Sequence, residues 1–139
     1  MSRKRYIVDA YAWIEYFIGS EAGKKVKEVL EDGSCEVYTC AVTVAEIVSK
    51  VAREGRNPEV AYDILLRNSN IIDADHELSK DAGILHAEVR KTVKDFELAD
   101  AYVLASARRL KAKTSPETRI SEGLKRPCPF RGSLALCSD

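Results

Sequence analysis

The sequence predicts a three-layer α/β/α domain around a central, mostly parallel sheet. Short apolar segments alternate with segments of helical period along most of the chain, an order typical of parallel sheets that helices cover on both faces. The chain has 139 residues, of which 45% are hydrophobic and 32% are charged. This length and composition suit one globular domain with a substantial core, and they leave too little chain for two.

The expected strands are short apolar segments rich in strand-forming residues. They lie at residues 4–9, in CEVYTCAV at 35–42 and in NIIDAD at 70–75. The expected helices have apolar residues at helical spacing, and several follow a residue that commonly caps a helix, such as Asp9, Ser20 or Asn57. They cover approximately residues 10–18, 20–33, 44–51, 58–65, 77–92 and 97–111.

This pattern fails from about residue 114 onward. The segment KTSPETRISEGLKRPCPFRGSLALCSD has no clear period and holds three of the four prolines. A buried helix in an α/β fold should be followed by another short apolar strand, and none is evident in this segment. We therefore expect a domain at residues 1–113 and an atypical tail at 114–139, with the last strands missing or altered.

Charge, cysteine and glycine patterns argue against several classes of function. The net charge is zero, so no general attraction to nucleic acid is expected. The four cysteines lack metal-ligand spacing and there are only two histidines, which argues against a zinc site. No glycine-rich loop follows the first strand, which argues against nucleotide binding. Because Asp9 and Glu15 interrupt the apolar start, we expect a cytoplasmic protein with neither signal peptide nor membrane span.

Three acidic residues lie where helices are expected to meet one edge of the sheet. Asp9 ends the first strand, Glu46 follows the second, and Asp100 interrupts the apolar start of the last helix. Each has an ordinary structural explanation. Asp9 can cap a helix, Glu46 can complete a capping box with Thr43, and Asp100 can complement a helix dipole. Alternatively, the three carboxylates share the carboxyl edge of the sheet and bind a divalent cation.

The metal-binding interpretation explains the three acids together. No basic residue is an obvious local partner for any of them, and clustered carboxylates repel one another unless a cation neutralises them. Oxygen-only ligation favours Mg²⁺ or Mn²⁺ over zinc. We therefore predict that Asp9, Glu46 and Asp100 form a metal site at the sheet edge.

The chain resembles PIN domains, above all the small VapC-type toxins, in three acidic motifs: YIVDAYAWIEYF, AVTVAEIV and FELADAYVLASARRLKAK. The resemblance covers roughly residues 4 to 113. It implies a ribonuclease that hydrolyses phosphodiester bonds with Mg²⁺ or Mn²⁺, with Asp9, Glu46 and Asp100 as catalytic metal ligands. It also implies single-stranded or looped RNA as substrate, an antitoxin protein as partner, and a homodimer.

The resemblance breaks in the tail. PIN domains continue with a strand that ends in a TGD or TxD motif and supplies a fourth acid, whereas this chain reads TSPETRISEG. Codons chosen for residues 114–122 and read one frame over spell LTGDPDFRG, the segment that the family would have. One hypothesis is therefore a tail that is out of frame, by natural mutation or by sequence error. An uninterrupted frame in the resequenced gene, together with close relatives that share this tail, would contradict it. The other is a divergent tail in which Glu117 replaces the fourth metal ligand.

Two alternative functions stay open. The atypical tail favours a catalytically impaired module of the same fold, which binds RNA or a protein partner. A phosphatase with Asp9 as its nucleophile is the other alternative. Haloacid dehalogenase-like phosphatases carry a second Asp two residues further on, however, where this chain has Tyr11.

Overall fold

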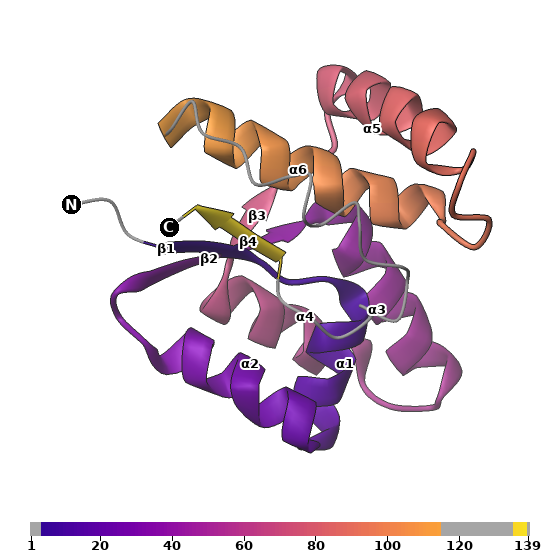
Figure 1. Ribbon diagram of the computed structural model, residues 1–139. Coiled ribbons are helices and arrows are strands. Elements are labelled where there is room, and N and C mark those ends of the chain that lie inside the picture. The colour runs from indigo at the N-terminus through magenta and orange to yellow at the C-terminus, as the bar shows by residue number, and fades with distance from the viewer. Residues whose placement is uncertain (1–3, 115–134, 139) are drawn as a thin grey trace.

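A computed structural model describes the backbone of residues 4–114 and 135–138 and the side chains of residues 4–110. None of the helices in these ranges is both long and apolar enough to cross a membrane. Six helices and four strands are described (Figure 1), in the order β1 (Lys4–Ile7), α1 (Ala10–Ile18), α2 (Glu21–Glu31), β2 (Cys35–Cys40), α3 (Ala41–Arg53), α4 (Pro58–Asn68), β3 (Asn70–Ile72), α5 (His76–Val89), α6 (Leu98–Thr114) and β4 (Ala135–Ser138).

The sheet has the strand order β3-β2-β1-β4. β1 pairs in parallel with β2, β2 pairs in parallel with β3, and β4 pairs antiparallel with β1. The prediction of a mostly parallel sheet is therefore confirmed. The expectation that the tail contains no strand is wrong, since Ala135–Ser138 forms β4. Without β4, this edge of β1 would present unpaired backbone N–H and C=O groups. Pairing with β1 can therefore stabilise a strand even in a segment whose own sequence does not predict one.

Helices cover the sheet on both faces, which makes three layers (Figure 1). On one face a buried cluster joins Ile7 of β1 to residues of α5 and α6. On the other face a second cluster joins Val8 to residues of α1, α2, α3 and α4. Ile7 and Val8 are adjacent in the chain and both are fully buried, because successive side chains of an extended segment point to opposite faces. The predicted α/β/α architecture is confirmed.

A buried polar network ties α1 and α4 to the sheet. Trp13 of α1 donates a hydrogen bond from Nε1 to Oγ1 of Thr39 in β2 at 3.1 Å. The same Oγ1 lies 2.7 Å from Oγ of Ser69, at the end of α4. Because these three buried or half-buried polar groups satisfy one another, the network fixes the position of both helices against β2.

Contacts at both ends fix α6 against α5. The carbonyl oxygen of Phe96 lies 3.1 Å from Nε2 of His86 and 3.3 Å from Nη1 of Arg90. A carbonyl oxygen only accepts, so Nε2 of His86 carries the proton of that bond. Farther along α6, Arg109 donates hydrogen bonds of 2.8 and 3.0 Å to Asp75, the N-cap of α5. The N-terminus of α6 is therefore held in a defined place beside the sheet.

Glycine is required where α1 turns into α2. Gly19 ends α1 with a φ of 79°, a conformation that residues with a Cβ rarely adopt. A Cβ on Gly23 would collide with the carbonyl group of Glu15. Close packing of α2 on the end of α1 therefore depends on glycine at this position.

Candidate functional site

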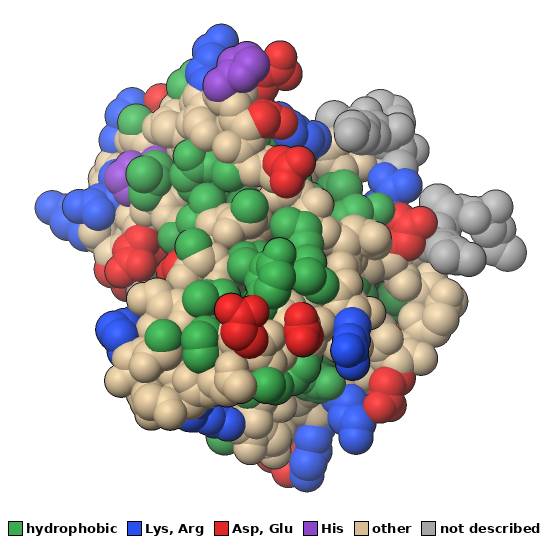
Figure 2. Space-filling model, turned by 180° about the vertical axis from the view of Figure 1, so that it is seen from behind, with side chains coloured by type: hydrophobic (Ala, Val, Ile, Leu, Met, Phe, Trp, Pro, Cys, Tyr) green, Lys and Arg blue, Asp and Glu red, His purple; other side chains and the backbone are tan. Residues whose placement is uncertain are grey.

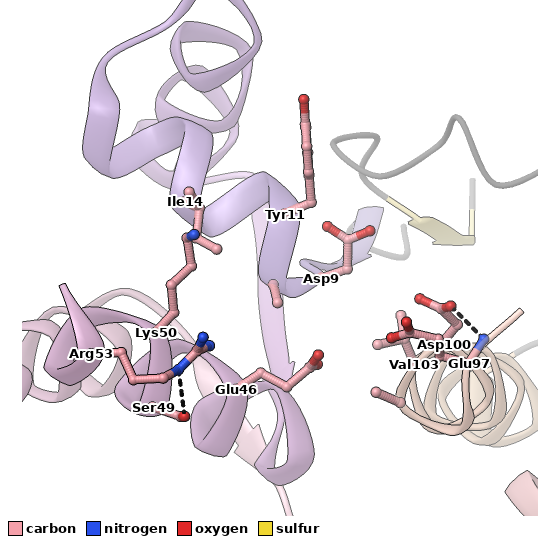
Figure 3. A pocket seen from close by; sticks show the side chains of 12 residues that line it. Asp9, Tyr11, Ile14, Glu46, Ser49, Lys50, Arg53, Glu97, Asp100 and Val103 are labelled. Carbon is pink, nitrogen blue, oxygen red and sulfur yellow. Dashed lines mark hydrogen bonds between the residues drawn. The ribbon is translucent and has the colours of Figure 1, made fainter. Parts of the chain in front are cut away.

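A pocket of about 440 Å³ lies where the segments after β1 and β2 meet the N-terminus of α6 (Figure 3). Among the described residues, four carboxylates line this pocket: Asp9, Glu46, Glu97 and Asp100. These residues lie in or beside β1, α3 and α6, which are far apart in the sequence. The parallel sheet brings the three elements together at one edge. All three predicted acids therefore face one pocket.

Asp9 lies directly after β1 and caps α1. Its backbone is extended, with φ −80° and ψ 172°, and its Oδ1 accepts a hydrogen bond from the backbone N–H of Ala12 at 2.8 Å. The predicted capping role is therefore confirmed. Both oxygens of a carboxylate can accept hydrogen bonds or bind cations, so this cap orients Asp9 at the pocket without excluding a second role.

Asp100 lies in the first turn of α6, and its Oδ2 accepts a hydrogen bond from the backbone N–H of Glu97 at 2.9 Å (Figure 3). This is the acidic half of a capping box, in which the side chain at the third helical position accepts a hydrogen bond from the backbone N–H of the residue before the helix. The predicted position of Asp100 in the first turn of a helix is confirmed, and the structure adds a capping bond to the predicted dipole stabilisation. The same bond fixes the direction in which its carboxylate meets the pocket.

Glu46 does not form a capping box with Thr43, so this expectation is wrong. α3 begins at Ala41, and its N-cap, Cys40, makes no side-chain capping bond. Thr43 is consequently inside the helix, where it is fully buried. Glu46 lies in the second turn, is exposed, and extends toward the N-terminus of α6 (Figure 3). Helix capping therefore does not account for the acid at this position.

Several polar side chains of the pocket had not been singled out from the sequence. Glu97 precedes α6 and adds a fourth carboxylate, while Lys50 and Arg53 of α3 add two positive charges. The expectation that no base lies near the acids therefore needs correction. The signal was present, because Glu46, Lys50 and Arg53 follow one another at i, i+4 and i+7 and so share one face of a helix.

Tyr11 of α1 also lines the pocket, and its ring extends away from Asp9 (Figure 3). A hydrogen bond with Glu15 is the main cause that raises the pKa of this hydroxyl above its ordinary value, and the negative charge of Asp9 adds a smaller effect. The phenol therefore keeps its proton at neutral pH and donates it to the carboxylate of Glu15.

A comparison with protein-family models decides the family of the chain. The model described as the PIN domain matches residues 6–114. The chain belongs to the PIN domain family. The resemblance predicted from the three acidic motifs is thus confirmed, and the match ends where the tail was expected to depart from the family.

The fold of this PIN domain is similar to that of VapC20 from Mycobacterium tuberculosis, a toxin that cleaves the sarcin-ricin loop. The TM-score is 0.62 at 16% sequence identity, and the similarity covers 84% of this chain and 93% of VapC20. At this identity the likeness is one of fold. No curated protein sequence matches the chain.

The donor chemistry of the PIN pocket suits a hard divalent cation. Carboxylate oxygens are the ligands that Mg²⁺ and Mn²⁺ prefer. Among the described residues, however, no three His, Cys, Asp or Glu side chains lie close enough together to hold one ion. Glu46 and Glu97 are exposed, and exposed side chains change rotamer readily, so both can turn toward an ion beside Asp9 or Asp100.

Two predictions concern residues outside the described part of the chain. Glu117, the predicted replacement for the fourth acid, lies within residues 115–134, for which no structure is described. The segment of the frameshift hypothesis, residues 114–122, lies there too, apart from its first residue. Both stay predictions.

Proposed function

We propose that this chain is a metal-dependent endoribonuclease, the toxin of a VapBC-type toxin–antitoxin pair. The observation that carries the proposal is the meeting of Asp9, Glu46 and Asp100 at one pocket of a PIN domain. The fold shared with a VapC toxin supports the toxin assignment. Asp9, Glu46 and Asp100 are the proposed catalytic metal ligands, for Mg²⁺ or Mn²⁺.

The three acids differ in how the fold holds them. Asp9 and Asp100 are oriented by their capping bonds, so their carboxylates occupy defined places. Glu46 is exposed and reaches into the pocket from α3. A bound Mg²⁺ or Mn²⁺ would activate a water molecule and neutralise charge on the phosphate. Without a cation the carboxylates repel an RNA phosphate, so cleavage should depend on added metal.

The proposed substrate is single-stranded or looped RNA, whose backbone can bend into a pocket between helices. The activity of VapC20 on the sarcin-ricin loop supports a looped substrate. We further propose an antitoxin that covers the pocket, a homodimer, and a cytoplasmic location. A small reading frame beside the gene would separate a toxin from an RNA-processing nuclease.

Asp9→Asn tests the proposal, because Asn caps helices as well as Asp does. RNA is incubated with the purified chain in Mn²⁺ or in EDTA, beside this variant. We expect cleavage only with Mn²⁺ and a loss of about 10²-fold or more in the variant. Asp63→Asn makes the same change at an exposed residue of α4, outside the pocket, and should cut RNA at the wild-type rate.

Equal cleavage by Asp9→Asn and the wild-type chain would contradict the role of Asp9. Absence of both RNA cleavage and Mn²⁺ binding in the wild-type chain would contradict the metal site as a whole. The capping bonds of Asp9 and Asp100 would then be sufficient explanations for those two acids.

A catalytically impaired PIN module that binds RNA or a protein partner is the second candidate. One observation favours it: the described residues hold no group of three potential ligands close enough for a metal ion. RNA binding by the wild-type chain, without cleavage at any Mn²⁺ concentration, would support this candidate over the nuclease.

A further inference from the structure

One face of α3 carries opposite charges along its length. Glu46, Ser49, Lys50 and Arg53 all line the pocket, and their spacing of i, i+3, i+4 and i+7 places them on a single stripe of the helix. With a rise of about 1.5 Å per residue, Lys50 lies roughly 6 Å and Arg53 roughly 10 Å along the axis from Glu46. The pocket is therefore acidic beside α6 and basic toward the C-terminal half of α3 (Figure 3).

Lys50 is held by an ion pair and Arg53 by a hydrogen bond, and an anion could replace the first and add to the second. Lys50 Nζ lies 3.7 Å from Glu54, and the two side chains are 42% and 47% exposed. An exposed pair of this kind contributes little stability. A phosphate can therefore replace Glu54 as the partner of Lys50 at little cost in free energy. Toward the described residues, Arg53 donates only its Nε–H, to Oγ of Ser49 at 3.4 Å. The terminal nitrogens of a guanidinium match a phosphate in geometry.

RNA needs such a local attraction on this protein. The net charge of the chain is zero, and on the face shown in Figure 2 acidic and basic side chains are interspersed among apolar ones. The four carboxylates of the pocket themselves repel phosphates. Lysine and arginine contacts to backbone phosphates supply affinity and set the register of a strand without reading its sequence.

We propose that Lys50 and Arg53 form a binding subsite for the RNA backbone, which holds phosphates adjacent to the one at the acidic end of the pocket. The inference rests on the proposed function for its substrate class. Binding at the subsite needs no metal, however, and it can therefore be measured apart from cleavage.

The test compares two double variants that each remove two positive charges. Lys50→Gln with Arg53→Gln alters the subsite. Lys24→Gln with Arg67→Gln is the matched control, because both residues are exposed helix residues outside the pocket, and Lys24 also pairs with a glutamate, Glu21, at 2.9 Å. Binding of a fluorescent single-stranded RNA is followed by anisotropy in EDTA over a range of salt concentrations. Thermal unfolding checks that both variants are folded.

We expect the subsite variant to lose about tenfold in affinity and the slope of log Kd against log salt to fall by roughly 1 to 2, with the control near wild type. Equal affinity of the subsite variant and wild type would overturn the proposal. So would an equal loss in the control, which would reveal attraction by overall charge, or the absence of any RNA binding by the wild-type chain.

Cleavage in Mn²⁺ separates this proposal from the nuclease assignment. If the wild-type chain cuts RNA, the subsite variant should have a KM about tenfold higher with little change in kcat. The lost contacts bind the RNA equally well in the ground state and in the transition state. An unchanged KM would overturn the subsite and leave the nuclease assignment standing. If no chain cuts RNA but the subsite variant alone loses affinity, the nuclease assignment fails and the subsite stands.

Discussion

Asp9 and Asp100 each accept a backbone N–H at the start of a helix, at 2.8 and 2.9 Å, with the carboxylate that also lines the pocket. At the scale of single residues, a structural role and a proposed functional role thus fall on the same atoms. Helix capping requires only an oxygen that accepts a hydrogen bond, which Asn also has. Metal binding requires the negative charge of the carboxylate. The two roles can therefore be separated by an isosteric substitution.

Thr43 is fully buried, and its Oγ1 has no hydrogen-bond partner among the described residues. A buried hydroxyl without a partner destabilises a fold by roughly 1–3 kcal/mol. Thr43→Val replaces this hydroxyl with a methyl group of similar volume. We therefore expect the free energy of unfolding to rise by about 1 kcal/mol, measured by urea unfolding at neutral pH.

Thr39→Val is the matched control for this substitution. Thr39 is equally buried, but its Oγ1 binds Trp13 and Ser69. Its loss leaves the buried indole N–H without its partner, so the free energy of unfolding should fall by about 1–3 kcal/mol. A similar fall in both variants would contradict the view that the Thr43 hydroxyl is unpaired.

The sequence predicted those site residues that stand out against an apolar background. Asp9 and Asp100 interrupt apolar segments, so each demanded an explanation. Lys50 and Arg53 were not singled out, because basic residues on the outer face of a helix are the normal condition of a soluble protein. Only the pocket, a product of the tertiary fold, distinguishes them from other surface charges.

At the scale of elements, the pairing of α5 with α6 should respond to pH. Two hydrogen bonds from Arg109, with a further one from the backbone N–H of Leu78, hold the pKa of Asp75 well below its usual range. Because folding lowers this pKa, the ionised carboxylate stabilises the fold above the unfolded pKa of about 3.9. That contribution is lost as the pH falls toward the lower folded pKa.

Arg109→Gln should consequently lower Tm most at neutral pH, and the difference from wild type should shrink below about pH 4. Thermal unfolding across this pH range measures the effect. Arg108→Gln is the control, because Arg108 is the exposed neighbour on the same helix. A Tm difference that stays constant with pH would show that Arg109 stabilises the fold by packing and not through Asp75.

Most elements were predictable because their signals are local. Ser20, Asn57 and Asp75 each accept a hydrogen bond from the first turn of a helix, as capping residues do. The start of α3 was misplaced because no turn separates it from β2, so the apolar run continued the strand pattern. β4 was missed because its stability comes from pairing with β1 at the other end of the chain.

At the scale of the whole molecule, β4 covers one edge of β1 and completes the sheet. Removal of residues 135–139 should expose that edge. We expect the free energy of unfolding to fall by about 1 kcal/mol or more, and self-association to increase through the unpaired strand. Urea unfolding and size-exclusion chromatography at several protein concentrations measure the two effects.

A chain that lacks only Asp139, beyond β4, is the control for this truncation and should behave like the full chain. If the longer truncation unfolds at the same urea concentration and stays in the same oligomeric state, pairing with β4 contributes nothing to stability. The domain would then be complete without its C-terminal strand.

The double role of Asp9 also bears on how such a gene evolves. Codons for Asp and Asn differ by a single base, and Asn keeps the helix cap that Asp9 makes with Ala12. One mutation can therefore yield an allele whose product keeps the helix cap and the fold, yet lacks the negative charge that the proposed chemistry requires. If the proposed activity harms the cell, selection would keep such alleles, and the fold would persist in descendants after the activity had gone.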